Sequence, residues 1–209
     1  MRLPALLLAA ALPAPLFAAD PTTVGEDLFP LAVGNTWTYK VQPFAGTGQP
    51  FQDDRFVVRV VRKEMVGEQT CFVLEARLKD RVAATEHVAF TRDGLTRFRA
   101  DSYDIVPPVT ILRFSVAPKT PWSTEYQLGE RKATATFTQE PTSITYQGKR
   151  TRTTSVRGEM GGENGGRGRP TTSTTVWYAA GVGMVRQTID EGGKRAATLL
   201  ELERFERAE

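Results

Sequence analysis

Short segments with the pattern of β-strands follow one another along almost the whole chain, separated by turn residues. Residues 133–138 alternate strictly between apolar and polar side chains, with threonine at every second position, as in a strand with one buried face. Asp93-Gly94 stands between two such segments and favours a tight hairpin, because both turn positions tolerate positive φ. The segments are not separated by helical patterns of about 10–15 residues, which argues against a parallel α/β fold.

We expect about eleven strands, at 36–41, 55–62, 71–78, 86–92, 95–99, 111–116, 133–138, 143–146, 171–178, 183–189 and 195–205. The last segment is ambiguous, because residues 195–206 also have helical propensity, but the Gly192-Gly193 turn before it favours a hairpin. The predicted fold is all-β: a curved antiparallel sheet or half-barrel, with a closed barrel or a sandwich as alternatives.

The first 19 residues differ from the rest of the chain. Arg2, the apolar run Leu3 to Leu12 and the small residues Ala18-Ala19 have the layout of a secretory signal peptide. The apolar run is about half the ~20 residues that a membrane span needs, and no Cys follows it to carry a lipid anchor. We therefore expect a signal peptide at 1–19, a single all-β domain at 20–209, and a periplasmic or secreted location.

Glycines are concentrated between residues 157 and 170, where Met160 is the only large apolar side chain. This composition predicts a flexible loop, since glycine is expensive to order and little can be buried. The segment is basic, but it has no phosphate-binding pattern and no aromatic residues for stacking on bases. The net charge of +3 is also small, and we expect no nucleic-acid partner.

Side chains suited to catalysis or metal binding are few. The chain has one His, His87, and one Cys, Cys71, and no serine lies in a Gly-x-Ser-x-Gly elbow. We expect His87 on the solvent face of a strand, opposite Val88 and Phe90, and Cys71 as a small buried hydrophobe. The sequence thus predicts no catalytic residue, no metal site and no cofactor.

Aromatic residues are more suggestive of a binding site. Core packing explains most of them, but an apolar cavity inside a curved sheet would use the same residues. The candidate ligand-binding residues are Trp37, Tyr39, Phe114, Trp122, Trp177 and Tyr178. We expect the ring of Trp177 in the core, because it precedes Gly181-x-Gly183, which is typical of a bend or bulge where a strand turns a corner.

Two stretches resemble a group of exported bacterial proteins of unknown function. Residues 29–39 (Phe-Pro-Leu-Ala-Val-Gly-Asn-Thr-Trp-Thr-Tyr) are similar to their opening strand. Residues 176–185 (Val-Trp-Tyr-Ala-Ala-Gly-Val-Gly-Met-Val) are similar to their W-[YF]-A-x-G-V-G strand and turn. The group resembles the LolA/LppX-like half-barrels, curved sheets whose characterised members cradle acyl chains. The resemblance implies that fold and, less directly, an apolar ligand.

These observations together favour a non-catalytic periplasmic binding protein for an apolar or amphipathic ligand such as a lipid. The alternative is a scaffold or accessory subunit of a cell-envelope complex, which would dock a protein partner by strand addition. An apolar cavity of ~300 Å³ or more inside the sheet would favour ligand binding, whereas an interior filled with side chains would favour the scaffold.

Overall fold

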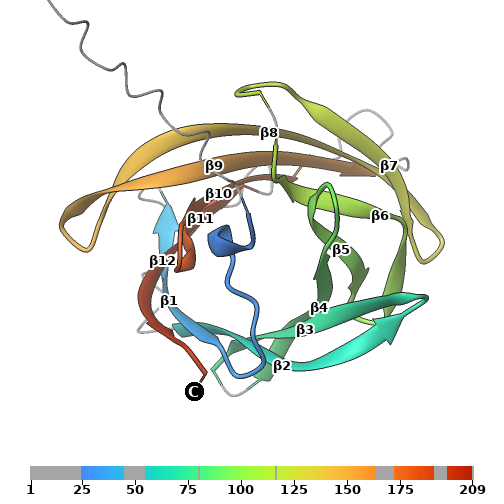
Figure 1. Cartoon of the computed structure of the whole chain (residues 1–209), viewed down its shortest axis with the longest axis horizontal. Helices are drawn as coiled ribbons and strands as arrows, with labels where there is room; N and C mark the ends of the chain where they lie inside the picture. Colours follow the sequence, from blue (N-terminus) through green and yellow to red (C-terminus); the bar gives the residue numbers. More distant parts are fainter. Residues whose placement is uncertain are drawn as a thin grey trace, which may run out of the picture.

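The protein is a closed antiparallel β-barrel in which each strand pairs with its neighbours in the sequence and β1 pairs with β12 (Figure 1). The computed structural model describes residues 25–44, 55–79, 81–115, 117–162, 172–190 and 197–208. Its strands are β1 (Thr36–Phe44), β2 (Arg55–Val66), β3 (Gln69–Leu78), β4 (Arg81–Phe90), β5 (Gly94–Ala100), β6 (Tyr103–Arg113), β7 (Trp122–Leu128), β8 (Arg131–Tyr146), β9 (Lys149–Gly162), β10 (Thr172–Ala179), β11 (Gly183–Asp190) and β12 (Ala197–Glu206).

The all-β prediction is confirmed, and of its alternatives the closed barrel is the one that the structure has. The sheet curves as expected but continues until its first and last strands pair. The ambiguous segment at 195–206 contains strand β12, and the two segments expected at 133–138 and 143–146 are one strand, β8. Strands β7 and β9 were not expected.

Strand β9 includes residues 157–162, which the sequence placed at the start of a flexible loop. All of them pair with β8, and residues 157–160 also pair with β10; Gly158, for example, lies opposite Phe137 and Thr174. A Cβ on Gly158 would lie 2.8 Å from the Phe137 ring, so this glycine lets the ring lie close to the neighbouring strand. The rest of the expected loop, at 163–170, and the expected signal peptide at 1–19 lie outside the described residues.

Alternation along the strands fills the barrel with apolar side chains. In β8, for instance, Ala135, Phe137 and Gln139 are buried while the residues between them are more exposed. The largest fully buried side chains, Trp37, Tyr39, Leu95 and Leu112, belong to strands from different parts of the ring. The core is therefore inside the barrel rather than between two layers.

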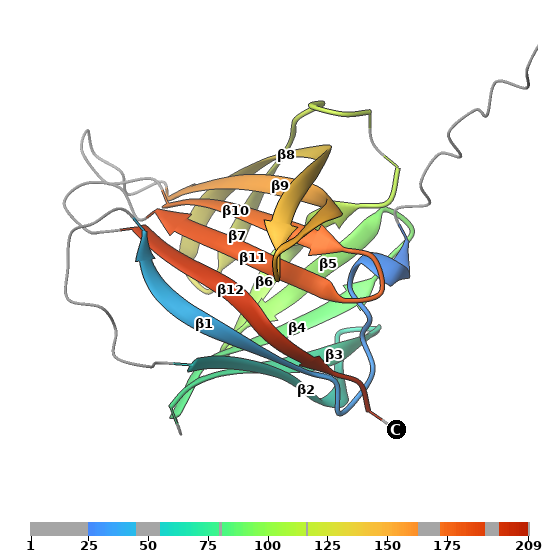
Figure 2. The same ribbon diagram turned by 90° about the vertical axis from the view of Figure 1, so that its left-hand side faces the viewer.

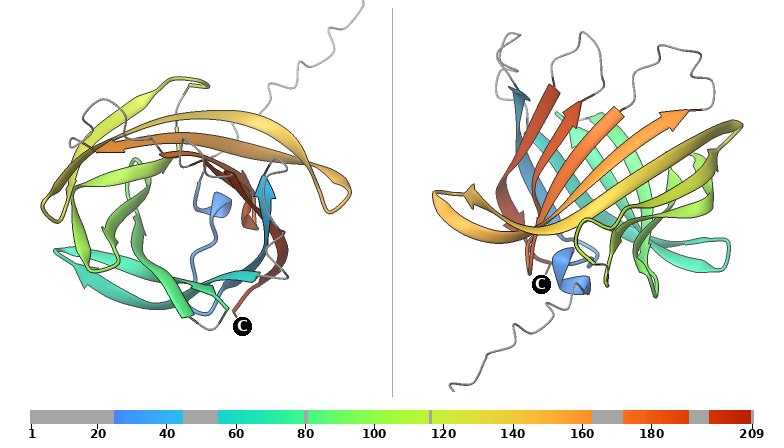
Figure 3. Two further views of the ribbon diagram at one scale, coloured as in Figure 1. Left: turned by 180° about the vertical axis from the view of Figure 1, so that it is seen from behind. Right: turned by 90° about the horizontal axis from the view of Figure 1, so that it is seen from above.

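One end of the barrel is closed by the short 3-10 helix η1 (Glu26–Leu28) and the residues that follow it (Figures 1 and 3). Phe29 stacks on Trp37, with ring centroids 5.0 Å apart, and meets Tyr178 edge-on at 6.0 Å. Gly183 has φ +98°, and a Cβ there would lie 3.0 Å from both Phe29 and Trp37. The two stretches that carry the family resemblance thus pack against each other.

The far end of the β8–β9 hairpin folds back over the outer wall of β11 and β12 (Figure 2). Arg186 Nη2 donates to Thr145 O at 3.1 Å, and Gln147 Nε2 donates to Glu203 O at 3.1 Å. Trp177 lies opposite Arg186 and so shares this outer face. It is half-buried, and the prediction that its ring lies in the core was wrong: its neighbour Tyr178 is the one that faces inward.

Candidate functional site

A cavity of about 230 Å³ lies inside the barrel, on the side formed by β5 to β11. Most of its lining is apolar, from Ala100, Ile105, Val109, Ile111, Leu128, Ala135, Phe137, Val156, Gly158, Met160 and Val176. Arg97, Tyr126, Thr174, Tyr178 and Gln187 contribute the polar groups. The volume is below the ~300 Å³ expected of a site for a whole drug-sized ligand, so the cavity suits a small molecule or part of a longer one.

Arg97 supplies the charge of this cavity. Its Nη2 pairs with Oε1 of Glu86 at 2.9 Å, while its Nε is buried without a hydrogen-bond partner among the described residues. A buried donor left in this way costs about 1–3 kcal/mol, which an acceptor on a bound molecule would recover. The site therefore combines an apolar lining with one unsatisfied donor.

A register shift in the β4–β5 ladder places the Arg97 side chain on the inner face of the barrel. Arg97 lies opposite Val88 and Arg99 lies opposite His87, with a register shift in the β4–β5 ladder between these pairs. Because Val88 and His87 are adjacent, they point to opposite faces of the sheet, and so do Arg97 and Arg99. Without the shift, two arginines two residues apart would share a face.

Tyr126 and Tyr178 add two hydroxyl groups to the polar part of the cavity lining. Burial is the main cause that raises the pKa of Tyr178, with Arg97 lowering it and Glu86 raising it. Burial likewise raises the pKa of Tyr126, and the charge of Arg97 lowers it. Both hydroxyls stay protonated near neutral pH and can donate a hydrogen bond to a ligand.

Only one of the six aromatic candidates, Tyr178, lines this cavity. Trp37, Tyr39 and Trp122 are buried with their polar atoms bonded to the backbone instead. Trp37 Nε1 donates to Val182 O at 2.6 Å, Tyr39 Oη to Met184 O at 3.0 Å, and Trp122 Nε1 to Thr110 O at 2.9 Å. These three side chains therefore have structural roles.

The other two aromatic candidates lie elsewhere. Phe114 is half-buried with its ring 5.8 Å from Phe90, and Trp177 is on the outer wall. Sequence reasoning missed Arg97, whose inward direction depends on a strand irregularity, and it left Tyr126, in the unexpected strand β7, out of the ligand-binding candidates. Tyr126 could have been found, because residues 122–128 alternate between apolar and polar side chains at several positions.

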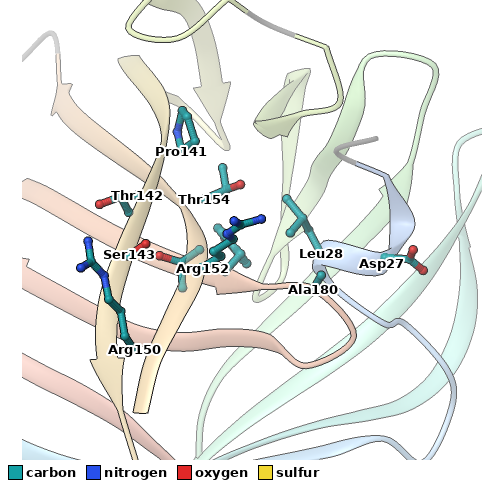
Figure 4. A pocket seen from close by; sticks show the side chains of 11 residues that line it. Asp27, Leu28, Pro141, Thr142, Ser143, Arg150, Arg152, Thr154 and Ala180 are labelled. Carbon is teal, nitrogen blue, oxygen red and sulfur yellow. The ribbon is translucent and has the colours of Figure 1, made fainter. Parts of the chain in front are cut away.

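A second, larger depression of about 630 Å³ lies at the closed end of the barrel, beside η1 and the β8–β9 hairpin (Figure 4). Arginines and hydroxyl groups contribute much of its lining, which consists of Asp27, Leu28, Pro141, Thr142, Ser143, Arg150, Arg152, Thr153, Thr154, Tyr178 and Ala180. Figure 4 shows Arg152 directed toward Leu28 and the carboxylate of Asp27 pointing away. This groove is less suited than the cavity to an apolar ligand.

His87 lies on the face opposite Val88, as expected, but it is 3% exposed, so the prediction of a solvent-facing His was wrong. Its Nε2 is 3.5 Å from Oε1 of Glu64, which also lies 3.4 Å from Nη1 of Arg99. These two long side chains, on the same face as His87, account for its burial. Burial is the largest cause that lowers the pKa of His87, against the opposite effect of Glu64.

Cys71 is fully buried, and burial raises the pKa of its thiol to about 11, so it is protonated at neutral pH. The described residues contain no group of three or more His, Cys, Asp and Glu side chains placed to hold a metal ion. Nor do they include a helix whose length and apolar character would let it cross a membrane.

No protein-family model and no curated protein matches the chain. Several solved structures are similar to it. A predicted exported protein with a YmcC-like fold from Bacteroides fragilis is 12% identical, with a TM-score of 0.45 and coverage of 84% of this chain and 97% of that one. A predicted lipoprotein from Parabacteroides distasonis is 12% identical, with a TM-score of 0.47 and coverage of 86% and 98%.

The third structure is the hypothetical lipoprotein YmcC from Escherichia coli, which is 10% identical, with a TM-score of 0.36 and coverage of 82% of this chain and 88% of that one. The assignment of this chain as a barrel rests on its own strand pairing.

Proposed function

We propose that the protein is a non-catalytic binding protein of the bacterial cell envelope, and that it holds an amphipathic ligand inside the barrel. The observation that carries the proposal is the apolar cavity with the unpartnered Nε of Arg97 in its wall. The ligand has an apolar body and a polar end that accepts hydrogen bonds. The envelope location is supported by the signal-like pattern of residues 1–19.

The two parts of the ligand have separate roles in this proposal. Burial of its apolar body would contribute roughly 25 cal/mol for each Å² removed from water. Its polar end would accept hydrogen bonds from Arg97 and from a tyrosine hydroxyl. Tyr178 is the cavity tyrosine that contacts Phe29 at the closed end of the barrel. Glu86 already pairs with Arg97, so the acceptor does not need a full negative charge.

By volume alone, the cavity of about 230 Å³ falls short of the ~300 Å³ that would favour ligand binding over the scaffold alternative. Closure of the sheet is what disfavours the scaffold. Strand addition needs a free sheet edge, and closure of a sheet into a barrel removes its edges. The most incomplete ladder joins β6 and β7, where Pro107 and Pro108 of β6 have no N–H to offer to an added strand.

The proposal can be tested with eight-carbon probes that differ only in their polar end: octanol, octanoate and octylammonium. Isothermal titration calorimetry should detect binding of octanol and octanoate, but much weaker binding of octylammonium, which has no acceptor. Absence of binding by all three probes would contradict the proposed function.

Arg97→Gln should weaken octanoate binding by about ten-fold or more, because it removes a charged donor. Glu86 would lose its partner in that variant, so the double variant Glu86→Gln/Arg97→Gln tests the same loss without an unpaired carboxylate. Arg157→Gln is the matched control, since Arg157 is exposed and paired with Glu159 away from the cavity. Equal affinity in all of these variants would exclude Arg97 from the site.

A further inference from the structure

The ladder between β6 and β7 is the shortest of the barrel in the described residues. It consists of two pairs, Ile105 with Leu128 and Val106 with Gln127, whereas β7 and β8 pair along seven residues. We call this junction the seam.

Beyond Val106 along β6, side chains replace the missing ladder. Trp122 Nε1 donates to Thr110 O at 2.9 Å. The Gln139 side chain bonds both backbone groups of Arg113: Nε2 donates to its carbonyl at 2.9 Å, and Oε1 accepts from its N–H at 3.1 Å. At Ile105 and Val106, by contrast, only two backbone pairs join the strands, so the seam can part locally at this end.

The inner cavity and a surface groove meet at the seam. Ile105, Val109 and Leu128, from the two strands of the seam, line the cavity. Outside lies a groove of about 450 Å³ lined by Val106, Pro107, Glu125, Tyr126, Gln127, Lys132, Ala133 and Thr134. Tyr126 lines both the cavity and the groove, and its side chain is half-buried.

Exposed apolar side chains lie on the outer side of the same junction. Val106 is 59% exposed and Tyr103, in the same strand, is 55% exposed. Isolated exposed hydrophobic residues are common, but these belong to a strand that also lines the cavity. They offer contacts to an apolar chain that extends out of the barrel.

We propose that the ligand enters through the seam and that its site continues past Tyr126 into the outer groove. The ligand is then an elongated, single-chain amphiphile that is longer than the 230 Å³ cavity can hold. Movement of the Tyr126 side chain joins the two spaces. This inference rests on the proposed function, because it concerns the route and the length of the ligand in that same cavity.

A disulfide across the seam tests the route. Val106 and Gln127 are exposed and directly opposite, and opposed residues of antiparallel strands have Cα atoms about 4.5–5.5 Å apart, within the range for a disulfide. The variant Val106→Cys/Gln127→Cys should lock the seam when oxidised. The matched control is Ser123→Cys/Thr136→Cys, which joins opposed residues of β7 and β8 whose hydroxyl oxygens are 2.9 Å apart.

Association of a dansylated undecanoate is followed by stopped-flow fluorescence. Oxidation of the seam variant should slow association at least ten-fold, reduction should restore the rate, and the control should show neither effect. Equal rates for the oxidised and reduced seam variant, with each redox state verified by mass spectrometry, would overturn the proposed route.

Equilibrium titrations of the unmodified protein test the length of the site. Dodecanoate should bind at least ten-fold more tightly than octanoate, because its additional carbons reach the groove. Equal affinities would overturn the extension past Tyr126. Both failures leave octanoate binding intact, whereas failure of the proposed function itself would appear as no octanoate binding at all.

Discussion

Two junctions of the barrel have short ladders among the described residues, and they differ in whether the interior beside them is filled. The seam has two residue pairs, and the β11–β12 junction has four, from Arg186 with Glu201 to Ile189 with Thr198. Beside β11–β12, Trp37 and Tyr39 donate to carbonyls of residues 182 and 184, and Phe29 and Phe205 stack on Trp37. Beside the seam lies a cavity. An incomplete ladder can therefore be compensated by packing or leave a space for a ligand.

The strongest test of this contrast is Trp37→Ala. Trp37 is fully buried between two stacked rings, so its removal should lower the free energy of unfolding by about 3–5 kcal/mol, measured by urea denaturation. Trp177→Ala is the control, because the half-buried Trp177 lies on the outer wall, and it should lose roughly half of that or less. Equal losses of unfolding free energy in the two variants would contradict the contrast between the packed β11–β12 junction and the outer wall.

A smaller difference should appear between Tyr39→Phe and Trp122→Phe, each of which removes a side-chain donor to a backbone carbonyl. The free energy of unfolding should fall more in Tyr39→Phe. Tyr39→Phe should lower the free energy of unfolding by about 1–3 kcal/mol, because it leaves the carbonyl of Met184 without this donor inside a packed core. Trp122→Phe removes the bond to Thr110 O, and a water entering from the cavity could replace it. Dodecanoate should also associate faster with Trp122→Phe, which stopped-flow measurements would show.

The smallest effect concerns alkaline pH. Burial, with smaller contributions from Tyr178 and Tyr146, raises the pKa of Tyr39 well above its usual value of about 10. Above pH ~10 the unfolded chain loses this proton while the folded protein keeps it, so stability falls as the pH rises. The free energy of unfolding should therefore decrease less between pH 9 and pH 11 in Tyr39→Phe than in the unmodified protein. Parallel pH profiles would show that Tyr39 is not held in a packed junction.

Local patterns in the sequence predicted much of the fold. The predicted hairpin joins β4 and β5, but its turn lies one residue earlier than expected, at Arg92 and Asp93. Thr91 and Gly94 exchange backbone hydrogen bonds of 2.8 and 3.3 Å, and Gly94, with φ +149°, is the first residue of β5. The expected bulge near Gly181-x-Gly183 is present as a register shift between Trp177 and Tyr178. Closure of the sheet was less predictable, because alternation reports which face a side chain is on and not how many strands complete the ring.

The candidate site was predicted less well, for a physical reason. Aromatic residues were selected because a cavity and a core use the same side chains, and the structure places Trp37 and Tyr39 in the core. Arg97 was not selected, because its inward direction depends on the register shift that separates it from Arg99. A single irregularity in a ladder changes the face on which later residues lie, and residue identity alone does not locate it.

The pairing of β1 with β12 also has a consequence for folding kinetics. Trp37 bonds to a carbonyl 145 residues further along the chain, so its final environment forms only when distant segments meet. Topologies rich in such long-range contacts fold slowly, and until the ring closes the edges of β1 and β12 stay unpaired. A chain that is still being synthesised thus cannot complete the ring before β12 is available, and the edge of β1 stays open during this interval.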